Sequence, residues 1–357
     1  MLGQRTGTGA AARLRGGGGG SPEKRFVDRG CLTTSSCRYT KHVREPGRIP
    51  ACIGGNAVTA VSIDEYAVTD AGGPYAITTG PDGALWFTMV HSGQIGRLAP
   101  GSEPTSWQLD PACRPMIIVP GADRALWFTE YQADRIGRIT PDGSVDEFPL
   151  PTPGCGPFGI AAGPDGALWF TETIADRIGR ISLDGQVTEF PLPATGAFPS
   201  AISAGADGGM WFTMNQANAI GRIGMDGRIT VHPLPTEAAA PVGITAGHDG
   251  ALWFVEIAAG QIGRITPGGV IVEFPLPDRA GRPHAITAGG DGKLWFTEWA
   301  GNRVGSITTD GTIETYNLST PGCEPHGITL GSDGALWSAL ENGSLARIAS
   351  ATTARSC

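Results

Sequence analysis

The chain has 357 residues and a formal net charge of −8, with 17% charged residues and 55 glycines. No segment is long and apolar enough to span a membrane, and the first 60 residues lack the apolar run of a secretory signal.

Residues 1–60 differ in composition from the rest of the chain. They hold ten Lys or Arg against three Asp or Glu, a run of five glycines and three of the seven cysteines, which leaves a net charge of −15 on residues 61–357. We expect a disordered, basic, glycine-rich arm. It has few aromatic residues and no amphipathic stripe, so we expect neither a nucleic-acid nor a membrane partner. An arm without function, or translated sequence upstream of the natural start, fits better.

A repeat of about 42 residues fills the remainder. A Leu-Trp or Met-Trp pair marks each of its seven copies, at Trp86, Trp127, Trp169, Trp211, Trp253, Trp295 and Trp337. This period, with a turn dipeptide in every copy, predicts a β-propeller.

One copy, residues 157–192, shows how a blade is built. Residues 159–163 form a short apolar segment, Asp165-Gly166 supplies a hairpin turn, and residues 167–173 continue as a Trp/Phe/Thr-rich strand. A third strand over 177–182, a second Asp-Gly turn and an alternating strand over 186–190 follow. No window has an apolar 3.6-residue period. The copy therefore predicts four antiparallel strands and no helix.

The two ends of the repeat region are complementary. Residues 62–66 match a fourth strand without the first three, and the seventh copy stops after Ile348 without its fourth strand. We therefore predict an all-β, seven-bladed β-propeller over residues 61–357, closed by the N-terminal strand completing the last blade.

The cysteines give little evidence of function. Cys113, Cys155 and Cys323 occupy the same repeat position, and no C-x-x-C pair occurs. Cys113 and Cys155 could approach each other on neighbouring blades, but a reduced, cytoplasmic protein is the simpler interpretation. We expect a monomer.

Residues that most copies share, such as Glu130, Glu172, Glu256 and Glu298, are interpreted as structural. Function is expected where the copies differ. After the repeat proline, at one mouth of the channel, the copies read Tyr75, Met116, Phe158, Ser200, Val242, His284 and His326. With six histidines in the whole chain, two in this column are more than chance predicts.

Blade seven alone adds carboxylates. Glu324 is the only acid in the column before the proline, and Glu341 is the only acid four residues after the repeat Trp. Two carboxylates beside two histidines suit a Mg²⁺ site with a neighbouring general base. The alternative is that both acids are solvated loop residues.

At these residues the sequence resembles the virginiamycin B lyase (streptogramin B lyase) family. The resemblance rests on Gly322-Cys323-Glu324-Pro325-His326-Gly327-Ile328, on Arg282-Pro283-His284-Ala285-Ile286-Thr287 and on Gly73-Pro74-Tyr75. It covers residues 61–357.

The resemblance implies a Mg²⁺-dependent enzyme that linearises cyclic depsipeptide antibiotics of the streptogramin B type by elimination at the lactone, conferring resistance. His326 would then be the general base, Glu324 and Glu341 would hold the metal, and His284 and Tyr75 would bind substrate. Met116, Phe158, Val242 and Trp299 would face the macrocycle.

Two other classes stay open. A metal-dependent lactone hydrolase of the gluconolactonase type would place more Asn and Asp around the channel, whereas Asn215 is the only Asn in the three mouth columns and none holds an Asp. A non-enzymatic ligand-binding propeller would need neither the histidine pair nor the isolated acids.

Overall fold

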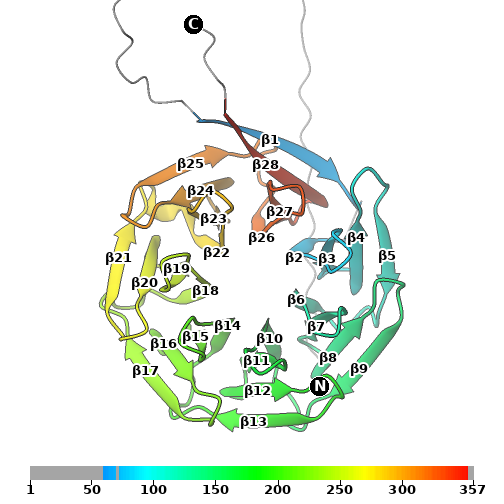
Figure 1. The fold of residues 1–357 in the computed structure, drawn as a ribbon, viewed down its shortest axis with the longest axis vertical. Helices are drawn as coiled ribbons and strands as arrows, with labels where there is room; N and C mark the ends of the chain where they lie inside the picture. The colour runs from blue at the N-terminus through cyan, green and yellow to red at the C-terminus, as the bar shows by residue number, and fades with distance from the viewer. Residues whose placement is uncertain (1–58, 70–71, 353–357) are drawn as a thin grey trace, which may run out of the picture. The chain divides into compact units, whose positions relative to one another are not determined.

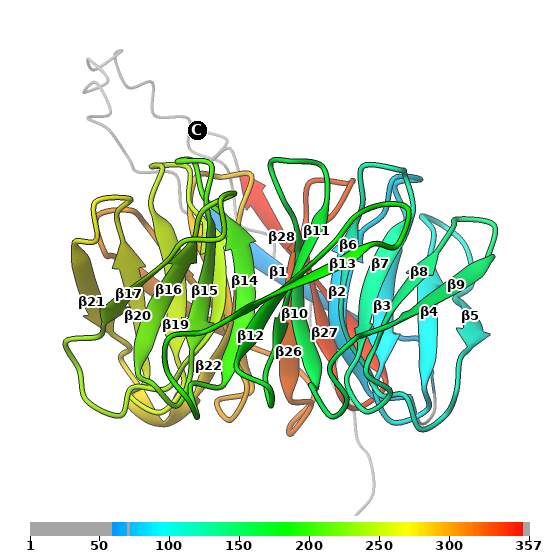
Figure 2. The same cartoon turned by 90° about the horizontal axis from the view of Figure 1, so that it is seen from below.

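The computed structural model describes residues 59–69 and 72–352. Within them, seven four-stranded antiparallel sheets stand in a ring around a channel (Figure 1), which confirms the predicted fold. The strands run roughly along the channel in side view, and the outer strand β13 crosses obliquely, as expected for twisted sheets (Figure 2). The predicted arm lies almost entirely outside the described residues, and the first strand begins at Thr59, two residues before the expected start.

Three blades follow one another after the first strand. Blade one is β2 (Pro74–Thr79), β3 (Leu85–Met89), β4 (Gln94–Leu98) and β5 (Thr105–Gln108). Blade two is β6 (Pro115–Pro120), β7 (Leu126–Glu130), β8 (Arg135–Ile139) and β9 (Val145–Pro149). Blade three is β10 (Pro157–Ala162), β11 (Leu168–Glu172), β12 (Arg177–Ile181) and β13 (Val187–Pro191).

The remaining blades repeat this order. Blade four is β14 (Pro199–Ala204), β15 (Met210–Met214), β16 (Ala219–Ile223) and β17 (Ile229–Pro233). Blade five is β18 (Pro241–Ala246), β19 (Leu252–Glu256), β20 (Gln261–Ile265) and β21 (Ile271–Pro275). Blade six is β22 (Pro283–Ala288), β23 (Leu294–Glu298), β24 (Arg303–Ile307) and β25 (Ile313–Asn317). Blade seven is β26 (Pro325–Leu330), β27 (Leu336–Leu340), β28 (Ser344–Thr352) and β1 (Thr59–Ala67). The described residues contain no α-helix, and their single 3-10 turn is η1 (Arg279–Gly281).

Each blade is held by the residues that the repeat shares. In blade three, the indole of Trp169 stacks on Phe190 and donates to the turn residue Asp165, which also accepts a hydrogen bond from Arg180. A Cβ at Gly179 would lie 2.0 Å from the ring of Phe170, so the third strand needs glycine there. The repeat motif is therefore a packing motif.

A threonine links each blade to the next in most of the ring. The hydroxyl of Thr171 in β11 donates to the carbonyl of Ser200 in the following blade at 2.6 Å, and Thr297 in β23 donates to the carbonyl of His326 at 2.8 Å. The acceptors belong to the column at the channel mouth. Shared residues therefore fix the backbone of the residues that vary.

The ring closes through the pairing of β1 with β28. The two strands pair antiparallel from Thr59 with Thr352 to Ala67 with Ser344 (Figure 1). Glu65 in β1 also accepts hydrogen bonds from the backbone of Ser319 and Thr320 in the loop that enters blade seven. In blade five, Glu273 of β21 accepts equivalent bonds from Thr236, in the loop that enters that blade.

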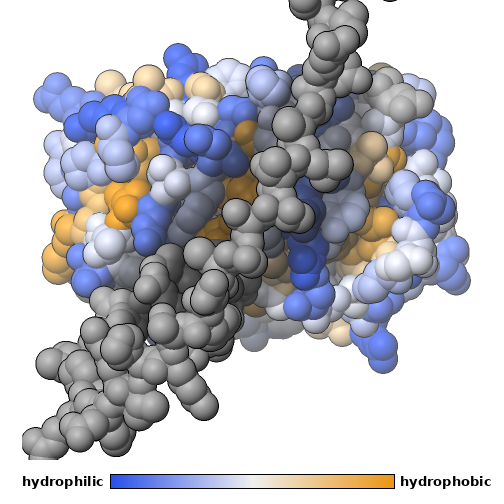
Figure 3. All heavy atoms as spheres, turned by 90° about the horizontal axis from the view of Figure 1, so that it is seen from above, coloured by the Kyte–Doolittle hydropathy of each residue, from blue (hydrophilic) through white to orange (hydrophobic). Residues whose placement is uncertain are grey.

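The outer surface of the ring on this side carries scattered hydrophobic side chains among hydrophilic ones (Figure 3). The described part of the chain has no helix long and apolar enough to cross a membrane.

Glu65→Ala is expected to lower the free energy of unfolding by roughly 1–2 kcal/mol. β1 has no hairpin connecting it to β28, whereas β21, which carries Glu273, is covalently continuous with its neighbour, so Glu273→Ala should cost less. Urea unfolding of both variants is the measurement. An equal loss would show that the contact of Glu65 plays no special part in closure.

Candidate active site

The first strand of every blade carries a β-bulge at the channel mouth. In blade seven the register shifts between Pro325 and Ile328, and in blade six between Pro283 and Ile286. Bulges bend a strand and redirect its side chains. His326 and His284 lie within these shifts, and both line one cavity at the channel mouth.

The residue before each repeat proline has a left-handed backbone conformation, with positive φ, in all seven blades. The φ angle lies between 50° and 61° at Gly73, Arg114, Gly156, Phe198, Ala240, Arg282 and Glu324. Five of these are not glycine, and an L-residue in this conformation costs about 1 kcal/mol. Such strain commonly persists where a side chain serves function. Glu324 reaches its position through this turn.

The structure brings Glu324, His326 and Glu341 together. One ligand atom from each lies within 4.8 Å of the others, and His326 Nε2 is 2.5 Å from Glu341 Oε2. His326 is 6% exposed, whereas Glu324 is exposed and Glu341 is intermediate. The hydrogen bond from His326 lowers the pKa of Glu341 to about 2, although burial alone would raise it. Glu341 is therefore a carboxylate at neutral pH.

His91 is a site residue that the sequence analysis missed. It follows β3 in blade one, and its Nε2 is 2.7 Å from Glu341 Oε1. Glu341 is thus held between two imidazoles from adjacent blades. His91 is the only titratable residue five positions after the repeat Trp in the seven copies, and that column would have revealed it.

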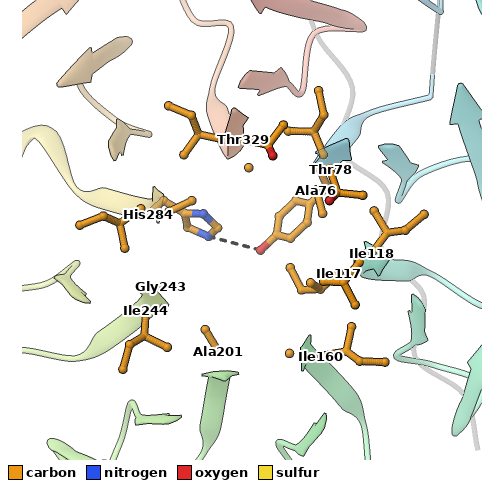
Figure 4. A pocket seen from close by; sticks show the side chains of 18 of the residues that line it. Ala76, Thr78, Ile117, Ile118, Ile160, Ala201, Gly243, Ile244, His284 and Thr329 are labelled. Carbon is orange, nitrogen blue, oxygen red and sulfur yellow. Dashed lines mark hydrogen bonds between the residues drawn. The ribbon is translucent and has the colours of Figure 1, made fainter. Parts of the chain in front are cut away.

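Tyr75 and His284 meet across the channel. The hydroxyl of Tyr75 is 3.2 Å from His284 Nε2, the hydrogen bond that Figure 4 shows. The rings of Tyr75 and His284 also lie 4.5 Å and 4.8 Å from that of His326. Burial lowers the pKa of His284 to about 3, with a further contribution from His326, and burial raises the pKa of Tyr75. Both groups are therefore neutral at physiological pH.

The predicted mouth residues divide between three cavities. One of about 360 Å³ contains the two histidines, both glutamates, Met116 and Trp299. A second of about 240 Å³ includes Phe158, and a third of about 250 Å³ in the channel includes Phe158 and Val242. Isoleucines such as Ile117, Ile160 and Ile244 line the channel around the Tyr75–His284 pair, together with Thr78 and Thr329 (Figure 4). All of the titratable residues that line these cavities come from the three mouth columns.

The shared glutamates lie elsewhere. Glu130, Glu172, Glu256 and Glu298 are buried at the ends of second strands, and none lines the cavity of the histidines. Burial raises the pKa of Glu172 to about 8, whereas Arg303 donates to Glu298 at 2.6 Å. Cys113, Cys155 and Cys323 are buried free thiols.

The fold and this cluster define a seven-bladed β-propeller with a group of histidine and glutamate side chains at one mouth of its channel. The family model described as the virginiamycin B lyase family matches residues 61–348, and the chain belongs to that family.

Individual relatives agree with this assignment. A virginiamycin B lyase of Saccharopolyspora erythraea is 69% identical over 51 residues, which are 14% of this chain and 17% of the relative. The match thus spans about a sixth of that curated relative. The crystal structure of a virginiamycin B lyase from Staphylococcus aureus is 43% identical, with a TM-score of 0.78 over 81% of this chain and 99% of that one. A catalytically inactive histidine-to-alanine variant of the Staphylococcus aureus protein with quinupristin gives the same values.

Proposed function

We propose that this chain is a Mg²⁺-dependent carbon–oxygen lyase that opens streptogramin B antibiotics at their lactone bond by elimination, and so confers resistance. The observation that carries the proposal is the cluster of Glu324, His326 and Glu341 at the channel mouth, with ligand atoms within 4.8 Å of one another. Membership of the virginiamycin B lyase family supports the choice of reaction. The Staphylococcus aureus variant with quinupristin supports the substrate class.

The residues of the cluster suit a hard cation. Mg²⁺ prefers carboxylate oxygens and keeps several waters, so Glu324 and Glu341 would hold it at this open mouth. Imidazole is a poorer ligand for Mg²⁺. A bound Mg²⁺ supplies Lewis-acid polarisation of the substrate, worth several kcal/mol in the transition state.

His326 is the base in this proposal. Its imidazole removes the α-proton of the threonine-derived residue, and the Glu341 carboxylate 2.5 Å from Nε2 orients the ring and stabilises the imidazolium that forms. The hydroxyl of Thr297 donates a hydrogen bond to the carbonyl of His326 and so holds the backbone of His326 in place.

His284 and Tyr75 bind substrate in this proposal. Because both are neutral and hydrogen-bonded to each other, they offer polar contact without competing for the metal. Met116 and Trp299 supply apolar surface beside them for the macrocycle. We also propose a cytoplasmic monomer with reduced thiols and without nucleic-acid or membrane partners. Sedimentation analysis of the purified protein would test the monomer, and thiol titration would test the reduced cysteines.

Mass spectrometry of a streptogramin B antibiotic incubated with the protein and Mg²⁺ tests the reaction. Elimination gives a linear product of unchanged mass, whereas a lactone hydrolase adds one water. EDTA should abolish conversion and added Mg²⁺ should restore it. A product heavier by one water would reject the lyase assignment, and no conversion at all would reject the substrate.

His326→Ala is expected to lower kcat by at least about 10²-fold with substrate binding retained, because a base acts in the transition state. His284→Ala should raise KM as well as lower kcat. Steady-state kinetics on both variants, with a substrate deuterated at the α-carbon, would separate the two roles. If His326→Ala keeps more than about a tenth of kcat, the base is another residue.

Glu324→Gln and Glu341→Gln are expected to weaken Mg²⁺ binding, and His91→Leu should weaken it by about tenfold because outer residues orient ligands. Calorimetric Mg²⁺ titration with antibiotic present, in a His326→Ala background that does not consume it, is the measurement. His248→Leu is the control, since that histidine bonds to the carbonyl of Gly289 and not to the cluster. Unchanged affinity in both glutamine variants would refute the metal assignment.

A further inference from the structure

Arg114 is the one arginine that lines the cavity holding Glu324, His326 and Glu341. It also lines the neighbouring cavity with Tyr131 and Phe158. Its backbone has φ 54°, in the left-handed region, at the same repeat position as Glu324. Glycine occupies this position in two blades and other residues in five, so the Arg114 side chain leaves the backbone from the same turn as that of Glu324.

The guanidinium of Arg114 has no carboxylate partner within residues 59–69 and 72–352. Repeat arginines such as Arg138 and Arg180 are engaged by turn aspartates at 2.7 Å. Arg282, at the same repeat position as Arg114, lies 5.8 Å from the ring of Trp299. The charge of Arg114 also opposes the rise in the pKa of Tyr75, which indicates that the guanidinium lies near the tyrosine hydroxyl. Arg114 is therefore a free cation directed at the mouth.

We propose that Arg114 binds the carboxylate that leaves when the ester bond of the substrate breaks. This inference rests on the proposed elimination. In the elimination, the base takes the α-proton, and the electrons of the C–H bond form a carbon–carbon double bond. The bond between Cβ and the ester oxygen then breaks, and that oxygen keeps the electron pair. The leaving group is thus a carboxylate with a full negative charge.

The Mg²⁺ that Glu324 and Glu341 would hold polarises the ester, and Arg114 would add a second cation for the charge that develops on the leaving oxygens. The glutamates themselves cannot supply it, and His326 is occupied with the proton. A guanidinium offers two parallel N–H donors that match the two oxygens of a carboxylate. The closed lactone lacks the charge, so Arg114 favours the transition state and the product over the bound substrate.

Calorimetry in EDTA, without Mg²⁺, on the isolated linear product and on its methyl ester, which lacks the charge, tests the inference apart from turnover and from the metal. The full chain should bind the acid about tenfold more tightly than the ester, because a hydrogen bond to a charged group contributes on this scale. Arg114→Gln should abolish the preference, and Arg114→Lys should retain part of it. Arg282→Gln is the matched control, since it changes an arginine at the same repeat position with the same backbone conformation, and it should keep the preference.

Kinetics should agree with the binding data. Arg114→Gln is expected to lower kcat by about 10- to 10²-fold with KM within a factor of two. An unchanged acid preference in Arg114→Gln would assign the leaving carboxylate to another group and overturn the inference, while leaving the lyase proposal intact. If the unmodified protein does not linearise the antibiotic, both fail together. If Arg114→Gln weakened the binding of the acid and of the ester equally, Arg114 would only contribute packing, and the inference would also be overturned.

Discussion

The pairing of β1 with β28 is the contact on which the site depends. The histidines, the two glutamates and Tyr75 of the candidate site lie on blades six, seven and one, and blade seven is complete only when β1 joins it. The bonds from Tyr75 to His284 and from His91 to Glu341 join residues 209 and 250 positions apart. Without closure, blade one would not lie beside blade seven. Closure of the ring, which leaves no open sheet edge, thus also brings the residues of the candidate site together.

The repeat separates stability from function along each strand. Tryptophan, turn aspartate and third-strand arginine secure one end of the blade, as Trp169, Asp165 and Arg180 do. At the other end, threonine hydroxyls bind the backbone carbonyls of the mouth column and not its side chains. Imidazole, phenol or apolar groups can therefore occupy the same position on different blades.

The fold could be predicted in nearly all its parts because the period, the Asp-Gly turns and the two incomplete copies are local sequence features. The prediction that β1 completes blade seven is confirmed by its register with β28. The site residues could be predicted only by comparing equivalent positions of the seven repeats, which identified His284, His326, Glu324 and Glu341. His91 was missed because its column was not compared, and its importance comes from a partner on another blade rather than from its own neighbours.

The backbone sets a further limit on sequence analysis. A glycine at the position before the repeat proline is easily explained by its positive φ, but Arg114 and Glu324 adopt the same conformation without that signal. Nothing in the residue types shows the strain, and only the equivalence of the seven copies makes it visible. Five non-glycine residues, Ala240 among them, carry the same backbone cost of about 1 kcal/mol, so the strain belongs to the repeat and the side chain decides what each position does. Of the three charged residues at that position, Arg114 and Glu324 line the cavity of the histidines, and Arg282 lies over the ring of Trp299, which also lines it.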